Sequence, residues 1–106
     1  MIARLWTART TAGQLPTYLE HLRGAVIPQM QKIDGYRGIS ILDRPLSDGI
    51  EVLVITYWRS IDAIRAFAGA DVEKAVVPKE AQVLLTAFDD RAKHLIVAFS
   101  DILPSE

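Results

Sequence analysis

The sequence predicts an α+β domain with an antiparallel sheet and with helices on one face of that sheet. The first observation is the segment 51–69, in which an apolar strand runs through Trp58 into a helix that Ser60 can cap at its N-terminus. The second observation is that residues 52–55 are apolar on both faces of the strand, so both sides of the sheet must be covered. The chain has too few helices for both sides, which predicts that a second subunit covers one of them.

The first part of the chain predicts a strand followed by a long helix. Residues 2–7 form the strand, and a polar loop leads to Gln14. From there apolar residues recur every three or four positions, which indicates an amphipathic helix that ends at Asp34 and Gly35. Pro28 has no backbone N–H group and should kink or divide this helix. The buried stripe of the helix consists of Leu15, Tyr18, Leu19, Leu22 and Val26.

The middle of the chain predicts a β-hairpin and a second helix. Residues 36–43 and 50–59 form two strands, and the loop 45–49 between them contains the Pro, Ser, Asp and Gly of a turn. The helix that follows has Asp62 in its first turn, where a negative charge suits the positive end of the helix. Its buried stripe consists of Ile61, Ile64, Phe67 and Ala68.

The last third of the chain predicts short helical segments and a final strand. After Gly69 comes a helical turn over residues 72–76, and a new helix begins at Pro78, a position that favours proline. Residues 91–99 form the final strand. The inward side chains of the new helix are Ala81, Leu84, Leu85 and Phe88.

This order of elements is that of the ferredoxin-like βαββαβ fold. We expect one domain over residues 1–100 and a short C-terminal tail over residues 101–106. Right-handed crossovers place both helical connections on one face of a four-stranded antiparallel sheet and leave the other face bare. Exposing large apolar side chains such as Leu53, Ile55 and Leu95 costs about 1.5 to 3 kcal/mol each. Packing two such sheets face to face removes this cost, so we expect an isologous homodimer with a β-barrel-like centre.

Composition limits the classes of partner. The 106 residues include 12 basic and 13 acidic side chains, a formal charge of -1, which argues against nucleic acid and anionic membranes as partners. The absence of cysteine excludes disulfides, thiolate metal sites and a cysteine nucleophile. No histidine and glutamate have the helical spacing of a zinc site and no glycine-rich loop suits a phosphate, so we expect neither metal nor cofactor.

The N-terminus and the apolar runs bear on location. Residues 1–6 lead directly into a strand pattern, without the basic start and long apolar run of a signal peptide. No apolar run approaches the roughly 20 residues that span a bilayer. A cytoplasmic location is therefore expected.

Five segments spread over nearly the whole chain carry a family resemblance. They are residues 1–6, Tyr57-Trp58-Arg59-Ser60, residues 64–71, Ala75-Val76-Val77-Pro78 and residues 88–97. In these segments the sequence resembles the antibiotic biosynthesis monooxygenase family, and the resemblance implies a dimeric α+β barrel. That family includes cofactor-free oxygenases of polyketide anthrones and quinols, haem-degrading enzymes, and members without an assigned activity.

The chain departs from the better understood branches of that family. Haem-degrading relatives carry an iron-ligating histidine after the start of the second crossover helix, an asparagine near the end of the first strand, and a tryptophan on that helix. Counted from the strand-end tryptophan, these places fall on Val77, Thr7 and Phe67, which argues against haem cleavage. The anthrone oxygenases share the strand-end tryptophan, but the asparagine expected four residues before it is Val54 here.

The two histidines are the candidates for a catalytic base. A cofactor-free oxygenase must deprotonate an electron-rich phenol or enol, and histidine suits this role because its ordinary pKa lies near neutral. His94 lies in the middle of a strand among apolar residues, so it either lines a pocket as the base or is a structural histidine held by a hydrogen bond. His21 falls on the polar side of the first helix and is expected at the surface.

Four other side chains are candidates for substrate binding. Trp58 either forms an aromatic wall with an indole donor or closes the end of the core. Arg4 and Trp6 share a face of the first strand, so Arg4 either stabilises an oxyanion beside an aromatic ring or is a surface or dimer-contact residue. Phe67 either packs in the core or lines the cavity. Three tyrosines are phenolic donors or structural residues: Tyr18, Tyr36 and Tyr57.

The function that these features favour is that of a cofactor-independent monooxygenase acting on a small aromatic or polyketide-type substrate, with His94 as base. The alternative is a protein that binds, isomerises or cyclises a small hydrophobic molecule in the same cavity without oxidising it. A chiefly structural dimer would have a cavity well below about 300 Å³. Haem degradation is a weaker alternative, which requires one of the two histidines to ligate iron.

Overall fold

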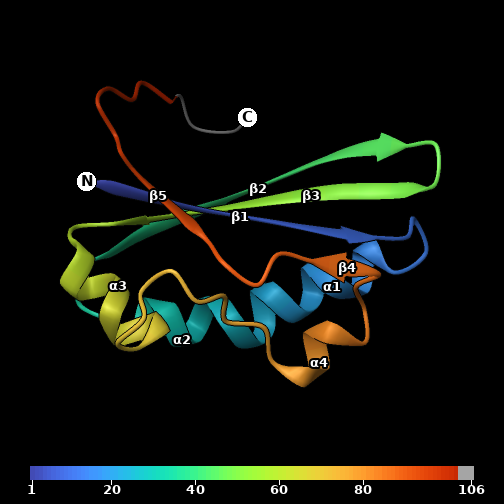
Figure 1. Ribbon diagram of the computed structural model, residues 1–106, viewed down its shortest axis with the longest axis horizontal. Coiled ribbons are helices and arrows are strands. Elements are labelled where there is room, and N and C mark those ends of the chain that lie inside the picture. Colours follow the sequence, from blue (N-terminus) through green and yellow to red (C-terminus); the bar gives the residue numbers. More distant parts are fainter. Residues whose placement is uncertain (103–106) are drawn as a thin grey trace.

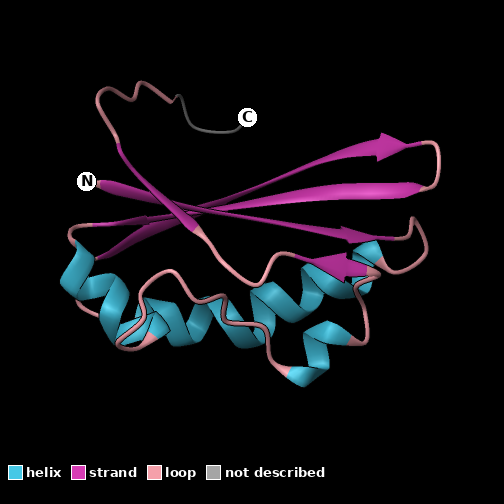
Figure 2. Cartoon of the chain, viewed as in Figure 1, coloured by secondary structure: helices cyan, strands magenta, loops and turns pink. Residues whose placement is uncertain are grey.

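The helices lie against one face of an antiparallel sheet in the computed structural model, which describes residues 1–102 (Figure 1). The strands are β1 (Ile2–Thr10), β2 (Tyr36–Leu46), β3 (Gly49–Trp58), β4 (Ala87–Phe88) and β5 (Lys93–Ile96). The helical segments are α1 (Leu15–His21), the π-helix η1 (Leu22–Val26), α2 (Ile27–Gln31), α3 (Ile61–Ala68) and α4 (Lys79–Gln82). Figure 2 shows the two layers, with strands above and helices below. The ferredoxin-like α+β fold that the sequence predicts is confirmed.

Strand β1 lies between β3 and the two C-terminal strands. It pairs with β3 in antiparallel register, from Ile2 opposite Trp58 to Thr10 opposite Ile50. At its other edge β1 pairs with β4 through residues 8–9 and with β5 through residues 2–5. The sheet order is β2-β3-β1-β4, with β5 also on β1. Strand β5 lies within the predicted final strand, residues 91–99, whereas β4 lies in the segment before it, which the sequence predicts to be helical.

The predicted final strand, residues 91–99, is shortened to β5 at residues 93–96, and its first residues are held elsewhere because the segment before β5 pairs with a loop. The N–H of Ala92 donates to the carbonyl of Glu73 at 2.7 Å, and the N–H of Ala75 donates to the carbonyl of Asp90 at 2.9 Å. These bonds hold residues 90–92 against the loop rather than against β1. They also explain why the loop forms a turn and a short extended bridge where the sequence predicts a helical turn.

Helix α4 is shorter than the sequence predicts. Because α4 is a single turn, Phe88 lies in β4 and is 38% exposed instead of pointing inward from a helix. Strands β1 and β2 extend beyond their predicted ends at Thr7 and Asp43. Leu84 and Leu85, which the sequence predicts to point inward from this helix, follow the end of α4 but still pack against the core.

The long helix predicted from Gln14 is divided before Pro28, and the division takes the form of a π-helical turn. The N–H of Ile27 donates to the carbonyl of Leu22, five residues earlier in the chain. This wide turn brings residues five positions apart toward the same side of the helix. The side chains of the helix that are buried are Tyr18, Leu22 and Met30. In the described part of the chain, no helix combines the length and apolarity needed to cross a membrane.

The core lies between the helices and the facing side of the sheet. Alternate residues of β3 are buried on that side: Val52, Val54, Thr56 and Trp58. One buried cluster joins Tyr18 and Leu22 to Val52 and Val54, and a second joins Met30 and Ile64 to Trp58. Each large apolar side chain buried in this way stabilises the fold by about 1.5 to 3 kcal/mol.

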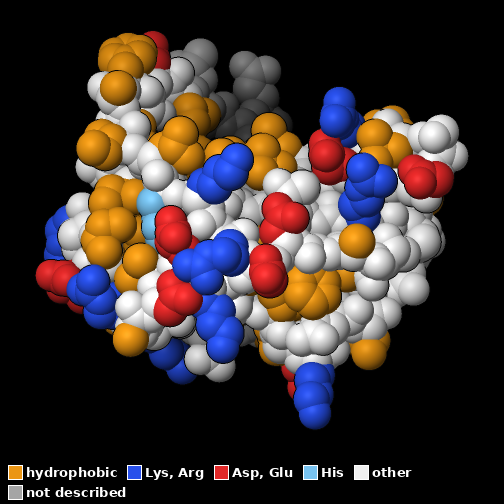
Figure 3. Space-filling view, viewed as in Figure 1, with side chains coloured by type: hydrophobic (Ala, Val, Ile, Leu, Met, Phe, Trp, Pro, Cys, Tyr) orange, Lys and Arg blue, Asp and Glu red, His pale blue; other side chains and the backbone are white. Residues whose placement is uncertain are grey.

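The opposite face of the sheet carries no helix (Figures 1 and 2). Leu42 is 48% exposed and Leu95 is 50% exposed on this face, and Leu53 and Ile55 are half-buried. Figure 3 shows hydrophobic side chains gathering at the upper left, where β5 and the C-terminal segment lie, while charged side chains gather over the middle of the view. The predicted tail begins in this segment at residue 101, and residues 103–106 lie outside the described residues.

Candidate functional site

Two adjoining hollows form the site: an inner pocket between the helices and the sheet, and an outer cleft lined by helices and loops alone. The inner pocket has a volume of about 60 Å³, and the outer cleft has a volume of about 620 Å³. The outer cleft is in the range of small-molecule sites, about 300 to 1,000 Å³, whereas the inner pocket is well below that range. The residues that line both hollows are His21, Val26, Phe67, Val76 and Pro78.

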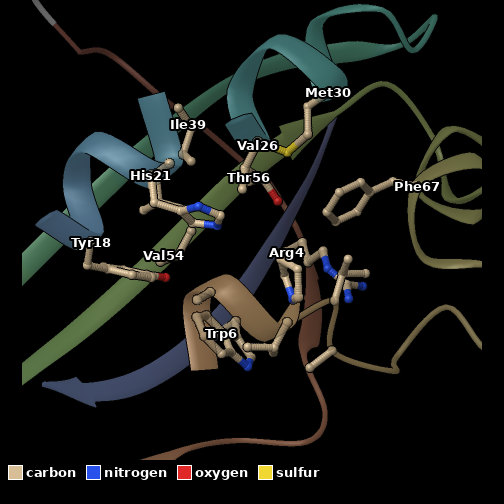
Figure 4. A pocket seen from close by; sticks show the side chains of 16 residues that line it. Arg4, Trp6, Tyr18, His21, Val26, Met30, Ile39, Val54, Thr56 and Phe67 are labelled. Atoms are coloured by element: carbon tan, nitrogen blue, oxygen red, sulfur yellow. The ribbon is translucent and has the colours of Figure 1, made fainter. Parts of the chain in front are cut away.

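Each wall of the site comes from a different part of the fold (Figure 4). Strands β1 and β3 form the floor of the inner pocket, through Arg4, Trp6, Val54 and Thr56. The helical run from α1 to α2 forms one wall of both hollows, and the C-terminal part of α3 forms another. The loop before α4 closes the inner pocket with Ala75, Val76, Val77 and Pro78.

Arg4 is a buried cation in the wall of the inner pocket, only 4% exposed. Its guanidinium donates to the carbonyl of Val72 and, at 2.7 Å, to the carbonyl of Lys74. None of the ion pairs among residues 1–102 involves Arg4. Burial lowers the pKa of Arg4, but a guanidinium remains protonated in proteins. The inner pocket therefore contains a positive charge that is stabilised by neutral groups and that would attract an anion.

His94 lies behind Arg4. The two residues are opposite each other in the register of β1 and β5, and Nη1 of Arg4 lies 2.8 Å from Nε2 of His94. Because a guanidinium can only donate, Nε2 accepts, and the hydrogen of the neutral ring is on Nδ1. Burial and, secondarily, the charge of Arg4 lower the pKa of His94, while Glu73 acts in the opposite direction. His94 lines neither hollow, so it reaches a ligand only through Arg4.

Trp58 supports the pocket from behind. It is fully buried, and its Nε1 donates to Oγ1 of Thr56 at 2.9 Å. The ring of Trp58 stacks on the ring of Phe67, with the two centroids 5.5 Å apart. The guanidinium carbon of Arg4 lies 5.9 Å from the centroid of the Phe67 ring. Phe67 lines both hollows, whereas Trp58 lines neither. The hydroxyl of Thr56 accepts from the indole and can still donate its own hydrogen into the pocket.

Trp6 is the second aromatic side chain of the inner pocket. Its Nε1 donates to the carbonyl of Asp89 at 2.6 Å, which fixes the ring against the segment after β4. Of the five residues predicted for the site, the structure thus brings three to the hollows and places two directly behind them. The three are Arg4, Trp6 and Phe67, and the two are Trp58 and His94.

His21 lines both hollows, although the sequence predicts it at the surface. It is half-buried at the end of α1, and its Nε2 is buried without a hydrogen-bond partner among the described residues. Figure 4 shows its ring entering the pocket from the helix side. The signal in the sequence is its spacing of three from Tyr18, which places His21 at the border of the buried stripe.

Tyr18 contributes its hydroxyl to the inner pocket. Its side chain is buried, and burial raises the pKa of Tyr18 to about 12. The phenol therefore stays protonated near neutral pH and can donate a hydrogen bond to a ligand. The sequence allows Tyr18 to be either a phenolic donor or a structural residue, because the pattern alone does not show where its hydroxyl points.

The site combines one imidazole, two hydroxyl groups and one cation in an otherwise apolar pocket. The groups are the imidazole of His21, the hydroxyls of Tyr18 and Thr56, and the guanidinium of Arg4. Among residues 1–102, no three or more histidine, aspartate or glutamate side chains are grouped so that they could hold a metal ion. The arrangement can accept a proton from an acidic hydroxyl and stabilise the anion that results.

Solved structures with the same fold cover almost the whole chain. A putative antibiotic biosynthesis monooxygenase from Bacillus cereus is 20% identical, with a TM-score of 0.66 over 99% of this chain and 98% of that one. A Streptomyces coelicolor monooxygenase solved with nanaomycin D is 22% identical, with a TM-score of 0.55 over 98% and 92%. The Mycobacterium tuberculosis haem degrader, solved with two haems in its active site, is 18% identical, with a TM-score of 0.57 over 95% and 99%. At these identities the likeness establishes the fold.

The family is established by a separate comparison. None of the curated proteins matches the chain. The family model described as antibiotic biosynthesis monooxygenase matches residues 1–79, which include β1 to β3, the helices from α1 to α3 and the loop that closes the inner pocket. This chain belongs to the antibiotic biosynthesis monooxygenase family.

Proposed function

We propose that the chain is a cofactor-independent monooxygenase that oxidises a small aromatic or polyketide-type substrate in the two hollows. The observation that carries this proposal is the buried guanidinium of Arg4, which has no carboxylate partner among residues 1–102 and faces an apolar pocket. A cation in such a setting stabilises a phenolate or enolate far better than water does. That anion is the species which can reduce oxygen without help from a cofactor.

The reaction balances without an external reductant. For an anthrone, the substrate loses a proton to give the enolate, and the enolate transfers electrons to O₂. The CH₂ carbon becomes a carbonyl carbon that holds one oxygen atom. The other oxygen atom leaves as water together with the two hydrogens of the CH₂ group. The carbon loses four electrons and O₂ gains four.

The walls of the pocket have separate roles in this proposal. Arg4 binds the anion, and Trp6 and Phe67 hold the flat faces of the substrate. Trp58 acts by supporting Phe67, on which it stacks. His94, predicted from sequence as the base, acts here as a positioning residue, because its Nε2 already accepts from Arg4.

The shared fold supports the proposal without determining the substrate. One solved relative is a monooxygenase in complex with nanaomycin D, an example of this fold holding an organic ligand. The outer cleft here, about 620 Å³, has room for a molecule of several fused rings. The inner pocket, about 60 Å³, is large enough only for the reacting edge of such a molecule.

The test is oxygen uptake by metal-free protein with anthrones, hydroquinones and naphthols as substrates. We expect catalysed uptake with at least one of them, and one labelled oxygen atom in the product under ¹⁸O₂. Arg4→Gln should lose at least tenfold in kcat/KM, and Arg9→Gln, an exposed arginine on the same strand, should not. Product that carries no label, or uptake that metal chelation abolishes, would contradict a cofactor-independent oxygenase.

The alternative is that the same hollows bind, isomerise or cyclise a hydrophobic molecule without oxidising it. The same anion-binding group would serve an isomerase through an enolate. Product formation under strict anaerobiosis would favour this alternative. Saturable binding without turnover, both in air and under anaerobic conditions, would indicate a carrier or a sensor.

Haem degradation is a weaker alternative. At the place where haem-degrading relatives carry their iron ligand this chain has Val77, a wall residue of the inner pocket that cannot ligate iron. The free Nε2 of His21 is the observation that favours haem as a substrate, since it faces the cleft. A haem titration whose Soret shift disappears in His21→Ala would support this alternative.

We also propose that the chain acts as a homodimer through the bare face of its sheet. Four large aliphatic side chains on that face are half-buried or half-exposed: Leu42, Leu53, Ile55 and Leu95. A second copy with the same face would cover them by isologous packing. The exposed Phe99 and Ile102 of the C-terminal segment add to the apolar surface that a partner could bury.

A further inference from the structure

We infer that His21 is the residue that accepts the proton of an acidic hydroxyl on the ligand, in place of His94. This inference rests on the proposed function for the identity of the reaction, but its central claim concerns binding. The claim is that Nε2 of His21 contacts a phenolic or enolic hydroxyl at the junction of the inner pocket and the outer cleft.

Nε2 of His21 is an unsatisfied polar atom of the site. It is buried, and no protein group among residues 1–102 forms a hydrogen bond to it. Leaving a buried polar atom unpaired costs about 1 to 3 kcal/mol, so native structures rarely keep one without a reason. Because the side chain of His21 lines both hollows, a molecule that passes from the cleft into the pocket meets its ring.

The local backbone also favours His21 as a residue of the site. His21 is the last residue of α1, and the π-helical turn η1 follows at once. The wide turn lets His21 and Val26, five residues apart, line the same two hollows, and Met30 continues the same wall of the inner pocket. Pro28 has no N–H group to complete a regular α-helical ladder through this region. The helix therefore deviates at the residues that face the site, which is where π-turns often occur in functional proteins.

The position of Arg4 relative to His21 favours the same role for His21. Arg4 enters the same pocket from β1, on the sheet side, while His21 enters from the helix side (Figure 4). A hydroxyl between them can transfer its proton to Nε2 of His21 and leave the oxygen anion facing Arg4. In this step one O–H bond breaks, one N–H bond forms, and the electron pair stays on oxygen, so no co-reactant is needed.

The two histidines differ in what they can do for a ligand. Nε2 of His94 already accepts from Arg4 at 2.8 Å, and His94 lines neither hollow. Nε2 of His21 has no such partner, and the side chain of His21 lines both hollows. His21 is thus the catalytic base and His94 is a positioning residue that orients the guanidinium.

The test uses 4-nitrophenol as a probe, because its ionised form has its own absorption band. At a pH at which the free probe is protonated, we expect the wild-type protein to bind it as nitrophenolate. In ¹⁵N-detected NMR, the ring nitrogens of His21 should shift in a saturable way on addition of the probe. His21→Gln should bind the nitrophenolate at least tenfold more weakly, and Glu20→Gln, exposed on the same helix, should bind it as the wild type does.

The outcomes separate the inference from the proposed function. Oxygen uptake absent on every substrate, with nitrophenolate binding that depends on His21, would overturn the oxygenase and keep His21 as the proton acceptor. Oxygen uptake unchanged in folded His21→Gln would keep the oxygenase and overturn the inference. Probe binding with no shift at His21, or no saturable binding of the phenol, would also overturn it. Where uptake is found, we expect His21→Gln to lower kcat/KM by about 100-fold, the size of a general-base effect.

Discussion

Nη1 of Arg4 lies 2.8 Å from Nε2 of His94, and the two residues face each other in the pairing of β1 with β5. The guanidinium needs an acceptor, so the contact requires a neutral imidazole with its hydrogen on Nδ1. Arg4 also donates to the carbonyls of Val72 and Lys74, which belong to the loop that leads to the inner pocket. One buried cation thus joins the first strand, the last strand and this loop.

The stability of the fold should depend on the protonation of His94. Burial, and then the charge of Arg4, lower the pKa of His94 in the folded chain, so between its folded value and the ordinary value near 6.5 the unfolded chain binds more protons. His94 therefore contributes stability above the ordinary pKa, and this contribution falls as pH drops through that window. Between about pH 8 and pH 5.5, the free energy of unfolding measured with urea should fall more for the wild type than for His94→Gln. Equal losses would contradict the lowered pKa.

Arg4→Ala should destabilise the fold, because it leaves two carbonyls and one imidazole nitrogen without their donor. We expect the free energy of unfolding to fall by about 1 to 3 kcal/mol. Arg9→Ala is the matched control, since its contact with Asp48 is 3.9 Å long and the two side chains are 51% and 75% exposed. Such a surface pair contributes little. Equal effects of the two substitutions in chemical denaturation would count against a structural role for the guanidinium.

Much of the fold could be predicted because strand and helix periodicity are local properties. The alternation of apolar residues predicts which side chains of β3 are buried. The same alternation predicts that Arg4 lies at the site, because Arg4 and Trp6 share a face of the first strand. The contact of Arg4 with His94 could not be predicted, since the residues are 90 positions apart and meet through strand register alone. For His21, helical spacing gives only a position at the border of the buried stripe, three residues from Tyr18, so the pattern alone does not decide between pocket and surface.

Tyr18→Phe should separate ligand binding from stability. The hydroxyl forms no hydrogen bond with another residue among the described ones, so its loss should change the melting temperature by little. Because burial raises the pKa of Tyr18 to about 12, the hydroxyl is a neutral donor over the usual range of assays. We expect a severalfold weaker Kd for 4-nitrophenolate, measured by absorbance titration. A large fall in melting temperature with unchanged Kd would show that the hydroxyl is structural.

The bare sheet face provides a test of the proposed homodimer. Leu42→Glu and Leu95→Glu place a charge on side chains that are 48% and 50% exposed, so each subunit should still fold. If two copies pack through this face, light scattering should give the mass of a dimer for the wild type and of a monomer for the double variant. Val83→Glu, at a residue 75% exposed beyond α4, should leave the mass unchanged. A monomeric wild type would contradict the proposal.

Filling the outer cleft should block the site without touching its polar groups. Ala25 is exposed in η1 and lines the outer cleft but not the inner pocket, so Ala25→Trp adds an indole to the route by which a ligand reaches His21 and Arg4. We expect binding of 4-nitrophenol to persist, because it is small, and binding of a fused three-ring anthrone to weaken at least tenfold. Ala12→Trp, exposed in the loop after β1 and part of neither hollow, is the control. Isothermal titration calorimetry of each variant with 4-nitrophenol and with the anthrone measures the two affinities. If Ala25→Trp leaves the affinity for the anthrone unchanged, large ligands do not enter through this cleft.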